Sequence, residues 1–478
     1  MARKLKFISI GLIGIICLCG YWLYVEKNNP TIEELVSEVK TNDVKIFLLG
    51  IDAATFKVIE PLVAAGELPH FKQLMHGGTY GPLRSEEPTK SPALWTTIVT
   101  GKNRNEHGVV DFLLPNPQPS EQKLVIPMST HRKVPALWTI ASRFKTTVGF
   151  TGWWASWPAE EVNGWVLSGA FTHANTLKAA PGLSENGHAV TTNVTYPELL
   201  ADEFQDYIID PMDPPVDEIC SFAALTDEEI IQLKAVERPL GGYGLSVFKF
   251  GYCSQRGAEE ATLNLLEKGQ PDLAGIMLPL IDVTSHTFWH YYEPEAFPDY
   301  TNTAKIERFK DMIPRVYKHH DAFIGRLLKK LDPNTILIIV SDHGFQATKN
   351  NPKEIPAFEL QENFSEPVSG TIEMGITGNH HIDGIILASG GPIKKGRQIK
   401  ASIYDIFPTI LALMGLPVPK DCEGRVLTDM IDETFFKKYP IKKIPSYNTL
   451  IPPNTAPQAR GNQHKLGVDM LRGLGYIE

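Results

Sequence analysis

Continuous apolar runs that lead into an aspartate leave few folds open to this 478-residue chain. The runs cover residues 44–50 (VKIFLLG) and 335–340 (TILIIV), and they are followed closely by Asp52 and Asp342. An apolar run without alternation is typical of a strand buried on both faces, as in a parallel sheet covered by helices. The sequence therefore predicts an α/β fold with these strands inside the molecule.

The apolar runs alternate with segments that carry helical patterns. Further strands are predicted at residues 147–151, 273–278 and 384–388. Helices are predicted at residues 56–65, 71–75, 138–144, 258–267 and 306–331. Strands that alternate with helices indicate a mostly parallel sheet with helices on both faces. We therefore expect a three-layer α/β sandwich.

The chain divides into six predicted parts. The stretch at 164–255 shows no clear alternation and is rich in Gly, Pro, Asn and acidic residues, which indicates an insertion that caps the edge of the sheet. The parts are an N-terminal membrane anchor (1–25), a linker (26–43), the first half of the core (44–163), the cap (164–255), the second half of the core (256–440) and a C-terminal tail (441–478).

The N-terminal segment is long and apolar enough to cross a membrane. Residues 7–25 carry no charge, and as a helix they would span about 28 Å, close to the roughly 30 Å of a bilayer core. Arg3, Lys4 and Lys6 precede the segment. Basic residues favour the cytoplasm, so the rest of the chain is expected outside, in the periplasm or the extracellular space. A cleaved signal peptide is the alternative, but no A-x-A-like site is found.

Composition narrows the classes of partner. The formal net charge is −9, which argues against a nucleic-acid binder, because such proteins usually carry a basic face. The five cysteines include no CxxC pair, which argues against a cysteine-ligated zinc site. Candidate metal ligands are therefore sought among Asp and His.

Several Asp and His side chains fall where the ligand site of such a fold would lie. In open α/β sheets that site is beyond the carboxyl ends of the strands, where Asp52, Asp342 and His343 are expected. Asp282 and His286 also follow a predicted strand, and their spacing of four places them on one face of a helix, where they could hold one metal. Each pattern alone has an ordinary structural reading as a helix cap, a turn or a surface ion pair.

A histidine pair further along the chain offers another ligand. His380 and His381 stand in the run Gly-Asn-His-His-Ile-Asp-Gly that ends at Gly384. One of the two could complete a metal site while the other is structural, and spacing alone does not choose between them. His290 continues the helical face of His286 by one more turn.

A serine at a predicted helix start is the candidate nucleophile. Ser91 precedes Pro92, so Ser is expected at the N-cap and Pro at the first helical position, which by itself explains both residues. A helix N-terminus also offers free N–H groups and partial positive charge to phosphoryl oxygens. No Ser-His-Asp pattern or GxSxG elbow is found, so activation of Ser91 by a metal is favoured.

Taken in order, these segments resemble the alkaline phosphatase superfamily, in particular its type I phosphodiesterase/nucleotide pyrophosphatase branch. The resemblance covers roughly residues 44–427 apart from the insertion, and the order of the motifs makes it specific. The motifs are Gly50-Ile51-Asp52, Pro88-Thr89-Lys90-Ser91, Thr100-Gly101 with His107-Gly108, Asp282 with His286, Ser341-Asp342-His343-Gly344-Phe345, and His380 with Gly384.

The resemblance implies two divalent metal ions, with zinc suited to these ligands and manganese as the alternative. The implied ligands of one ion are Asp282, His286 and His380, and those of the other are Asp52, Asp342 and His343. Ser91 would reach the second ion and act as the nucleophile, through a phosphoseryl intermediate. The family spacing favours His380 over His381, because His380 stands four residues before Gly384.

The chain departs from the nucleotide branch at two positions. Ser91 stands where that branch has Thr, and Leu94 stands where an Asn would contact the phosphate. These differences leave open the choice between nucleotide diesters and other phosphate esters. Lys90 could contact substrate or be a solvated lysine at the helix entry. Three tryptophans could wall an aromatic or lipid pocket, although packing under the insertion is favoured: Trp153, Trp154 and Trp157.

The expected activity is hydrolysis of a phosphate ester outside the cytoplasm, above all of a phosphodiester or nucleotide-type substrate. The substrate would be a small molecule or a lipid or glycan phosphoester. Alternatives on the same fold are a phosphomonoesterase, a sulfatase and a transferase of a phosphorus-containing head group. The sulfatase is disfavoured because Trp95 stands where those enzymes need Arg. A metal-stabilised binding protein is the non-enzymatic alternative, disfavoured because no expected ligand is missing.

Overall fold

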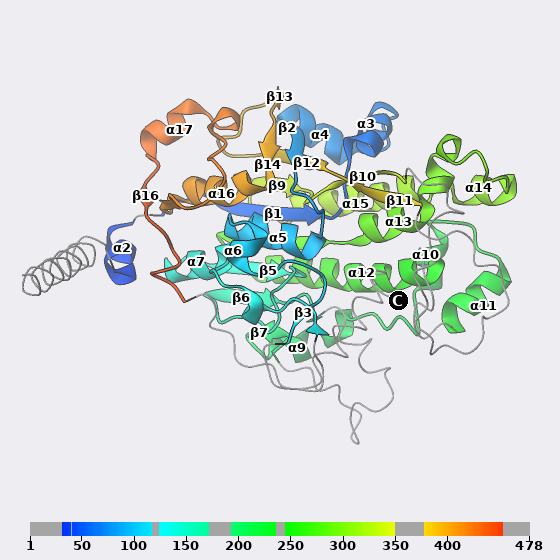
Figure 1. Cartoon of the computed structure of the whole chain (residues 1–478), viewed down its shortest axis with the longest axis horizontal. Coiled ribbons are helices and arrows are strands. Elements are labelled where there is room, and N and C mark those ends of the chain that lie inside the picture. Colours follow the sequence, from blue (N-terminus) through cyan, green and yellow to red (C-terminus); the bar gives the residue numbers. More distant parts are fainter. Residues whose placement is uncertain are drawn as a thin grey trace, which may run out of the picture.

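A ten-stranded sheet runs through the centre of the protein (Figure 1). The computed structural model describes residues 31–39, 41–116, 124–171, 193–235, 244–348 and 377–452. The five central strands are mutually parallel, and in spatial order they are β9 (Ile336–Val340), β1 (Ile46–Ile51), β8 (Leu273–Leu278), β5 (Val148–Thr151) and β6 (Gly164–Leu167). The predicted α/β fold with a mostly parallel sheet is confirmed.

Shorter or antiparallel strands border this parallel centre. On one side, β12 (Asp383–Ser389) runs antiparallel to both β9 and β2 (Gly78–Arg84). The short strands β13 (Arg397–Gln398) and β14 (Ala401–Ser402) pair with the outer side of β2. On the opposite side, β7 (Thr195–Tyr196) pairs antiparallel with β6.

Side chains of the central strands alternate between two hydrophobic cores. Along β1, Ile46 and Leu48 pack into one core, whereas Phe47, Leu49 and Ile51 pack into the other. All five are fully buried, which is why the sequence of this strand is apolar without alternation.

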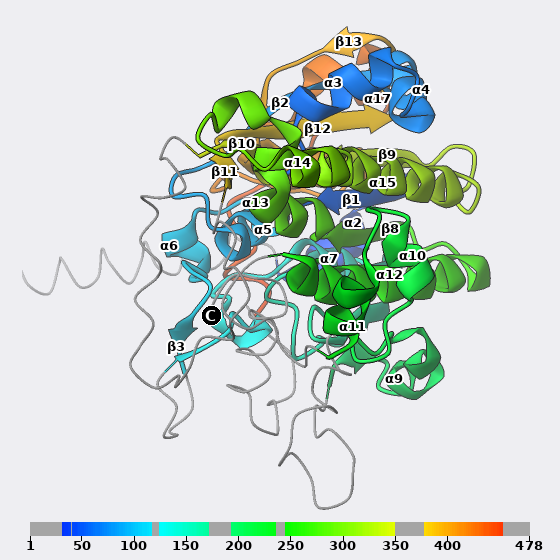
Figure 2. The ribbon, with the colours of Figure 1, turned by 90° about the vertical axis from the view of Figure 1, so that its right-hand side faces the viewer.

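Helices cover both faces of the sheet (Figures 1 and 2). The helices that pack into the Ile46 core are α5 (Ser91–Thr100), α7 (Leu137–Arg143) and α16 (Ile406–Met414). Those that pack into the Phe47 core are α3 (Phe56–Ala64), α4 (Pro69–Gly77), α12 (Leu245–Lys268), α13 (Leu280–Tyr292) and α15 (Met312–Leu328). The result is the expected order of helix, sheet and helix layers.

The single helix predicted at 306–331 is wrong. The structure has two helices there, α14 (Thr303–Phe309) and α15, which meet near Lys310. Pro314 explains the break, because a proline lacks an N–H and its ring clashes with the carbonyl four residues earlier. It is tolerated in the first turn of α15, where no intrahelical N–H bond is needed.

The segment predicted as a cap, 164–255, holds more regular structure than its composition suggested. It supplies the sheet strands β6 and β7 and the first part of α12, which begins at Leu245 rather than near residue 258. Short helices lie between them: α9 (Leu200–Glu203), α10 (Val216–Cys220) and α11 (Asp227–Ala235). The domain boundaries themselves stay a prediction.

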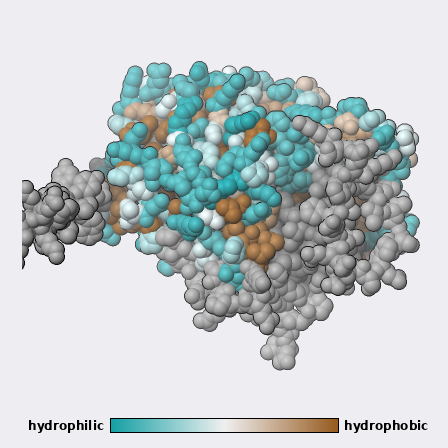
Figure 3. All heavy atoms as spheres, in the orientation of Figure 1, coloured by the Kyte–Doolittle hydropathy of each residue, from teal (hydrophilic) through white to brown (hydrophobic). Residues whose placement is uncertain are grey.

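The described residues contain no helix both long and apolar enough to span a bilayer. The N-terminal membrane anchor predicted at residues 1–25 lies outside the described residues. On the face shown in Figure 3, hydrophobic residues form small patches among hydrophilic ones.

Candidate active site

Three buried aspartates meet at the carboxyl edge of the central strands. Asp52 follows β1 directly, Asp342 lies two residues beyond β9, and Asp282 lies in the first turn of α13 after β8. Because β1 lies between β8 and β9 and all three run parallel, their carboxyl ends share one edge. None of the three aspartates has solvent-exposed surface.

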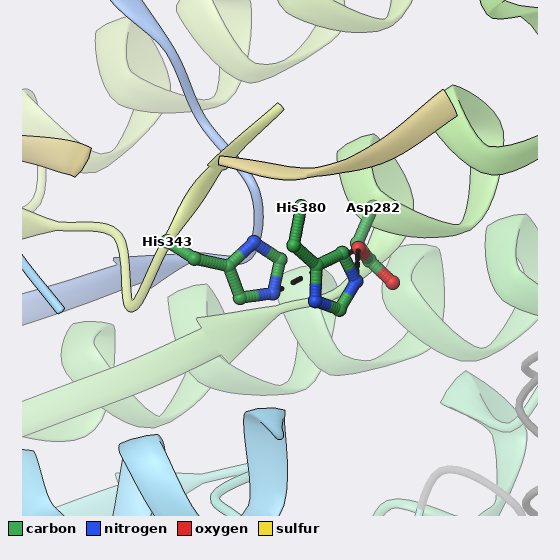
Figure 4. Close-up of side chains that lie close together, drawn as sticks. All are labelled: Asp282, His343 and His380. Carbon is green, nitrogen blue, oxygen red and sulfur yellow. Dashed lines mark ion pairs between the residues drawn. The ribbon is translucent and has the colours of Figure 1, made fainter. Parts of the chain in front are cut away.

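A two-stranded ribbon adds two histidines to this edge. His343 immediately precedes β10 (Gly344–Ala347), and His380 lies in the antiparallel partner strand β11 (Gly378–His381). Their rings stack with centroids 3.7 Å apart and an interplanar angle of 18°. Figure 4 shows both imidazoles directed towards the region of Asp282. The chain thus brings together residues 282, 343 and 380 from three separate segments.

The side chains predicted to hold the first metal lie at nearly equal distances from one another. Asp282 Oδ1 is 3.4 Å from His286 Nε2 and 3.3 Å from His380 Nε2. The two Nε2 atoms of His286 and His380 are 3.1 Å apart. Ligands that surround Zn²⁺ tetrahedrally at about 2.0–2.1 Å lie roughly 3.3 Å apart. The spacing of the three atoms therefore allows them to hold one cation together.

The side chains predicted to hold the second metal also converge, next to the serine. His343 Nε2 lies 3.3 Å from Asp52 Oδ1 and 3.6 Å from Asp342 Oδ2. Ligand atoms of these three residues all lie within 4.8 Å of one another. Ser91 Oγ is 3.3 Å from the same His343 nitrogen. The two sets adjoin, since His343 Nε2 is 4.0 Å from Asp282 Oδ1.

Backbone carbonyls orient all three histidines in the same way. The Nδ1 atoms of His286, His343 and His380 lie 3.3, 3.0 and 2.8 Å from the carbonyl oxygens of Gly378, Gly344 and Thr89. A carbonyl can only accept, so Nδ1 carries the proton in a neutral ring and Nε2 offers its lone pair. Such contacts are typical of histidines that ligate a metal through Nε2.

Several carboxylate oxygens of the cluster have no hydrogen-bond partner. Among the described residues, this holds for both oxygens of Asp282, both of Asp342 and Oδ1 of Asp52, all of them buried. Burying an unpaired carboxylate costs several kcal/mol, roughly, unless a cation or donor compensates it. The Asp and His donor set therefore fits one or two divalent cations.

Electrostatics point the same way. Burial, together with the nearby charge of Asp282, raises the pKa of Asp52 to about 8. Burial and the charge of Asp52 raise the pKa of Asp342 well above its usual range. Burial would also raise the pKa of Asp282, but His286 and His380 outweigh it and hold that pKa well below its usual value. Keeping all three aspartates ionised at this site therefore requires additional positive charge.

Ser91 sits one position further into its helix than the sequence predicted. Lys90 is the N-cap, and its carbonyl accepts from the N–H groups of Ala93 and Leu94. Ser91 is the first helical residue and Pro92 the second, a position that a proline tolerates because the first-turn N–H groups have no intrahelical partner. The Ser91 hydroxyl is fully buried and faces His343.

The remaining candidates lie outside the two ligand groups. His381 Nδ1 accepts from the Asp383 N–H at 3.1 Å, and buried His290 lies 3.1 Å from Thr377 Oγ1. Lys90 Nζ pairs with Asp111 at 3.3 Å and lies over the Phe112 ring. Packing, the role favoured for Trp153, Trp154 and Trp157 over that of pocket walls, agrees with their burial in the hydrophobic cores.

Two supporting residues were missed. Trp95 Nε1 donates to Asp52 Oδ2 at 3.0 Å, although the sequence analysis used Trp95 only as an argument against a sulfatase. Ser341 Oγ donates to the His343 carbonyl at 2.7 Å and accepts from the Ala54 N–H at 2.9 Å, which joins the loops after β1 and β9. In the sequence, only the position of Trp95 four residues after Ser91 could have indicated that it lies near the site.

Comparison with known families decides the class. The family model for type I phosphodiesterase / nucleotide pyrophosphatase matches residues 46–381, which is more than half of the chain. The chain belongs to this family. Membership of the type I phosphodiesterase / nucleotide pyrophosphatase family indicates a phosphoester hydrolase, and the members of this family are metal-dependent.

Individual proteins are similar only in part. Arylsulfatase K of Canis lupus familiaris is 26% identical over 173 residues, which are 35% of this chain and 29% of that protein. This chain thus spans less than a third of that relative's length. The structure of the alkaline phosphatase PafA matches with a TM-score of 0.50 at 12% identity, over 82% of this chain and 99% of that chain, and it supports the fold alone. Murine ectonucleotide pyrophosphatase / phosphodiesterase 5 has a TM-score of 0.45 and 14% identity, over 81% and 100% of the two chains.

Proposed function

We propose that this phosphodiesterase-family protein hydrolyses phosphodiester or nucleotide-type substrates with Ser91 as the nucleophile and two bound divalent cations. One observation carries the proposal. The buried Ser91 hydroxyl lies 3.3 Å from His343 Nε2, which lies within 4.0 Å of all three aspartates and belongs to a ring stacked on His380. A lone helix-capping serine would have no reason to face such a cluster.

The ligand sets assigned to the cations follow the distances above. Asp282, His286 and His380 would hold one, and Asp52, Asp342 and His343 the other, next to Ser91. When bound, zinc or manganese ions would supply Lewis-acid stabilisation of phosphoryl oxygens and lower the pKa of a nearby hydroxyl. Carbonyl contacts at Nδ1 keep the three imidazoles in the ligating tautomer.

The chain's own residues then perform a two-step displacement. Ser91 Oγ attacks phosphorus and loses its proton to solvent, while the P–O bond to the leaving alcohol breaks and that oxygen takes up a proton. Water then attacks the phosphoseryl ester, the Oγ–P bond breaks, and Ser91 regains its proton. Forming a covalent intermediate divides one difficult step into two easier ones.

The surroundings of Ser91 support a phosphate group with few charged oxygens. Leu94, one turn into the helix, is fully buried and offers no donor. Lys90, the described cation nearest in sequence, is already paired with Asp111. A diester, with one charge, needs less compensation than a monoester, with two, which favours the diesterase over the phosphomonoesterase.

The test uses paired nitrophenyl esters. We expect the full-length protein in detergent, with added Zn²⁺, to hydrolyse bis(4-nitrophenyl) phosphate faster than 4-nitrophenyl phosphate. Ser91→Ala should lower kcat by about 10³-fold or more, because the remaining groups can act only through solvent water. Asp342→Ala should lower both activity and metal content. Near-wild-type turnover by Ser91→Ala would overturn the assignment of the nucleophile.

A sulfatase is the second candidate, favoured by the partial match to arylsulfatase K. Trp95 occupies the position, four residues after the nucleophile, where sulfatases need Arg. We therefore expect 4-nitrophenyl sulfate to be turned over far more slowly than the phosphodiester in the same assay. Product analysis with an added alcohol acceptor separates hydrolysis from head-group transfer.

We further propose that the catalytic part lies outside the cytoplasm and is anchored to the membrane by a helix at residues 7–25. The support is the uncharged run itself and the basic residues Arg3, Lys4 and Lys6 before it. A version that lacks residues 1–30 should leave the membrane fraction and keep its activity. Digestion of the catalytic part by protease added to intact cells supports the outward topology, and protection contradicts it.

A further inference from the structure

The Asp52 carboxylate is held by an indole from the nucleophile helix. Trp95 is fully buried, and its Nε1 donates to Asp52 Oδ2 at 3.0 Å. The other oxygen, Oδ1, is buried without a hydrogen-bond partner among the described residues and faces His343 Nε2 at 3.3 Å. The two oxygens of this carboxylate thus differ: Oδ2 accepts the hydrogen bond from the indole, and Oδ1 points into the site.

Glycine 50 provides the space in which this indole lies. A Cβ at Gly50 would stand 2.6 and 2.7 Å from two ring carbons of Trp95, closer than real Cβ contacts allow. The end of β1 therefore has two functions. It leads into the candidate ligand Asp52, and two residues earlier it leaves a position without a side chain, where the indole fits. The indole packs against Gly50, and any larger side chain at that position would displace it.

A second tryptophan, Trp153, also holds Trp95 in place. Trp153 Nε1 donates to the Trp95 carbonyl at 3.0 Å, and the two rings meet edge to face at 5.3 Å and 86°. Both side chains are fully buried. Trp95 consequently has little freedom to rotate, and its N–H direction is set by packing.

We propose that Trp95 is a positioning residue that presents Asp52 Oδ1 to the cation beside Ser91. The inference rests on the proposed function, since it assumes that Asp52 ligates a cation. A carboxylate with one oxygen held by a rigid donor binds metal through the other oxygen at a small cost in rotational freedom. Partners of this kind typically contribute about 10–100-fold in metal affinity.

The test compares two substitutions that remove the same group. Trp95→Phe removes the indole N–H that donates to Asp52. Trp138→Phe is the matched control, because buried Trp138 donates in the same manner to the buried carboxylate of Glu160 at 2.7 Å, and Glu160 is not a candidate ligand. Zinc affinity is measured by competition with a coloured chelator on the full-length proteins, and folding is checked by circular dichroism.

We expect wild type and Trp138→Phe to bind two zinc ions with similar affinities. In Trp95→Phe one of the two sites should weaken by about 10–100-fold while the other is unchanged. Gly50→Ala keeps the indole but displaces it, and should weaken the same site. Equal affinities in wild type and Trp95→Phe would overturn the inference, whereas a wild type that binds no zinc would instead overturn the proposed function.

A measurement on the wild type covers the case in which Trp95→Phe does not fold. The protein has eight tryptophans, whose indole N–H signals can be observed by ¹⁵N labelling. One indole signal should shift on addition of zinc and exchange slowly with solvent, as expected of a buried donor to a ligating carboxylate. If none of the eight signals shifts, Trp95 does not act on the site.

Discussion

Hydrogen bonds on the side away from the cluster orient four of the six candidate ligands. Three backbone carbonyls select the Nε2 atoms of His286, His343 and His380, and one indole fixes Asp52. Ser341 acts at the backbone instead, where its hydroxyl bridges the loop of Asp52 and the loop of His343. The relative position of two ligand-bearing loops thus depends on one buried oxygen.

Ser341→Ala should therefore affect both stability and metal binding. It removes the bond to the His343 carbonyl and leaves the buried Ala54 N–H with only a long contact of 3.5 Å to the Ile51 carbonyl. We expect a loss of about 1–3 kcal/mol in the free energy of unfolding. Zinc affinity should fall as well, which urea denaturation and chelator competition can measure separately.

Ser129→Ala is the control for the loss of a buried hydroxyl. Ser129 Oγ donates to the Pro158 carbonyl at 2.7 Å and has no contact with the ligand groups. Its substitution should lower stability without changing zinc affinity. Equal zinc affinity in both variants would mean that Ser341 contributes to folding alone.

At this scale the sequence indicated which side chains to expect but not what supports them. Asp and His residues after predicted strands stand out by type and position, and the resemblance to the family added the two ligand sets, which stay a prediction. Spacing alone left His380 and His381 equal, and the resemblance to the family favoured His380. In the structure His380 Nε2 lies 3.3 Å from Asp282 Oδ1. Trp95 and Ser341 look like ordinary core residues until their partners from distant segments are known.

The arrangement of elements follows from burial. Strands β1, β8 and β9 are apolar throughout because both faces are covered, and their parallel order places three ligand-bearing ends together. The helix pattern was misleading where a local effect opposed it, as at Pro314, which separates α14 from α15. Strand β6 was missed since its four residues are too short to show a pattern.

Helix α15 carries a buried histidine that makes stability depend on pH. His320 has no exposed surface. Its Nδ1 lies near the Val316 carbonyl and its Nε2 near the Gln255 side-chain nitrogen, and both contacts suit a neutral imidazole. Burial, with the neighbouring charge of His319, lowers the pKa of His320 from 6.5 to about 4. The unfolded chain therefore takes up this proton first as the pH falls.

We expect the free energy of unfolding to fall between about pH 6.5 and 4 because of His320, by on the order of 3 kcal/mol in total. Above about pH 6.5 the group is neutral in both states and contributes no pH dependence. His320→Gln should flatten this part of the curve, measured by urea denaturation at several pH values. His76→Gln, at an exposed position, is the control and should leave the slope as it is.

On the scale of the whole molecule, the carboxyl edge of the sheet concentrates negative charge that the rest of the fold does not neutralise. Five buried carboxylate oxygens of Asp52, Asp282 and Asp342 have no hydrogen-bond partner in the described part of the chain. A bound cation would compensate them and, by binding the folded state alone, would stabilise it by about 2.7 kcal/mol at 100 times its dissociation constant.

Removing the metal should accordingly lower stability and activity together. After dialysis against a chelator, we expect the midpoint of thermal unfolding to fall by several degrees and phosphodiester hydrolysis to stop. Both should return on addition of Zn²⁺ or Mn²⁺. Ser91→Ala should show the same change in unfolding midpoint, although it has no activity to lose. If the chelator leaves the unfolding midpoint unchanged, the protein does not bind stabilising cations.

Anomalous X-ray scattering from a crystal grown with zinc would locate the bound cations. We expect two anomalous peaks about 3.5–4 Å apart. One should lie among Asp282, His286 and His380, and the other among Asp52, Asp342 and His343 within reach of Ser91 Oγ. A crystal with zinc in excess and no peak at these six side chains would contradict this expectation.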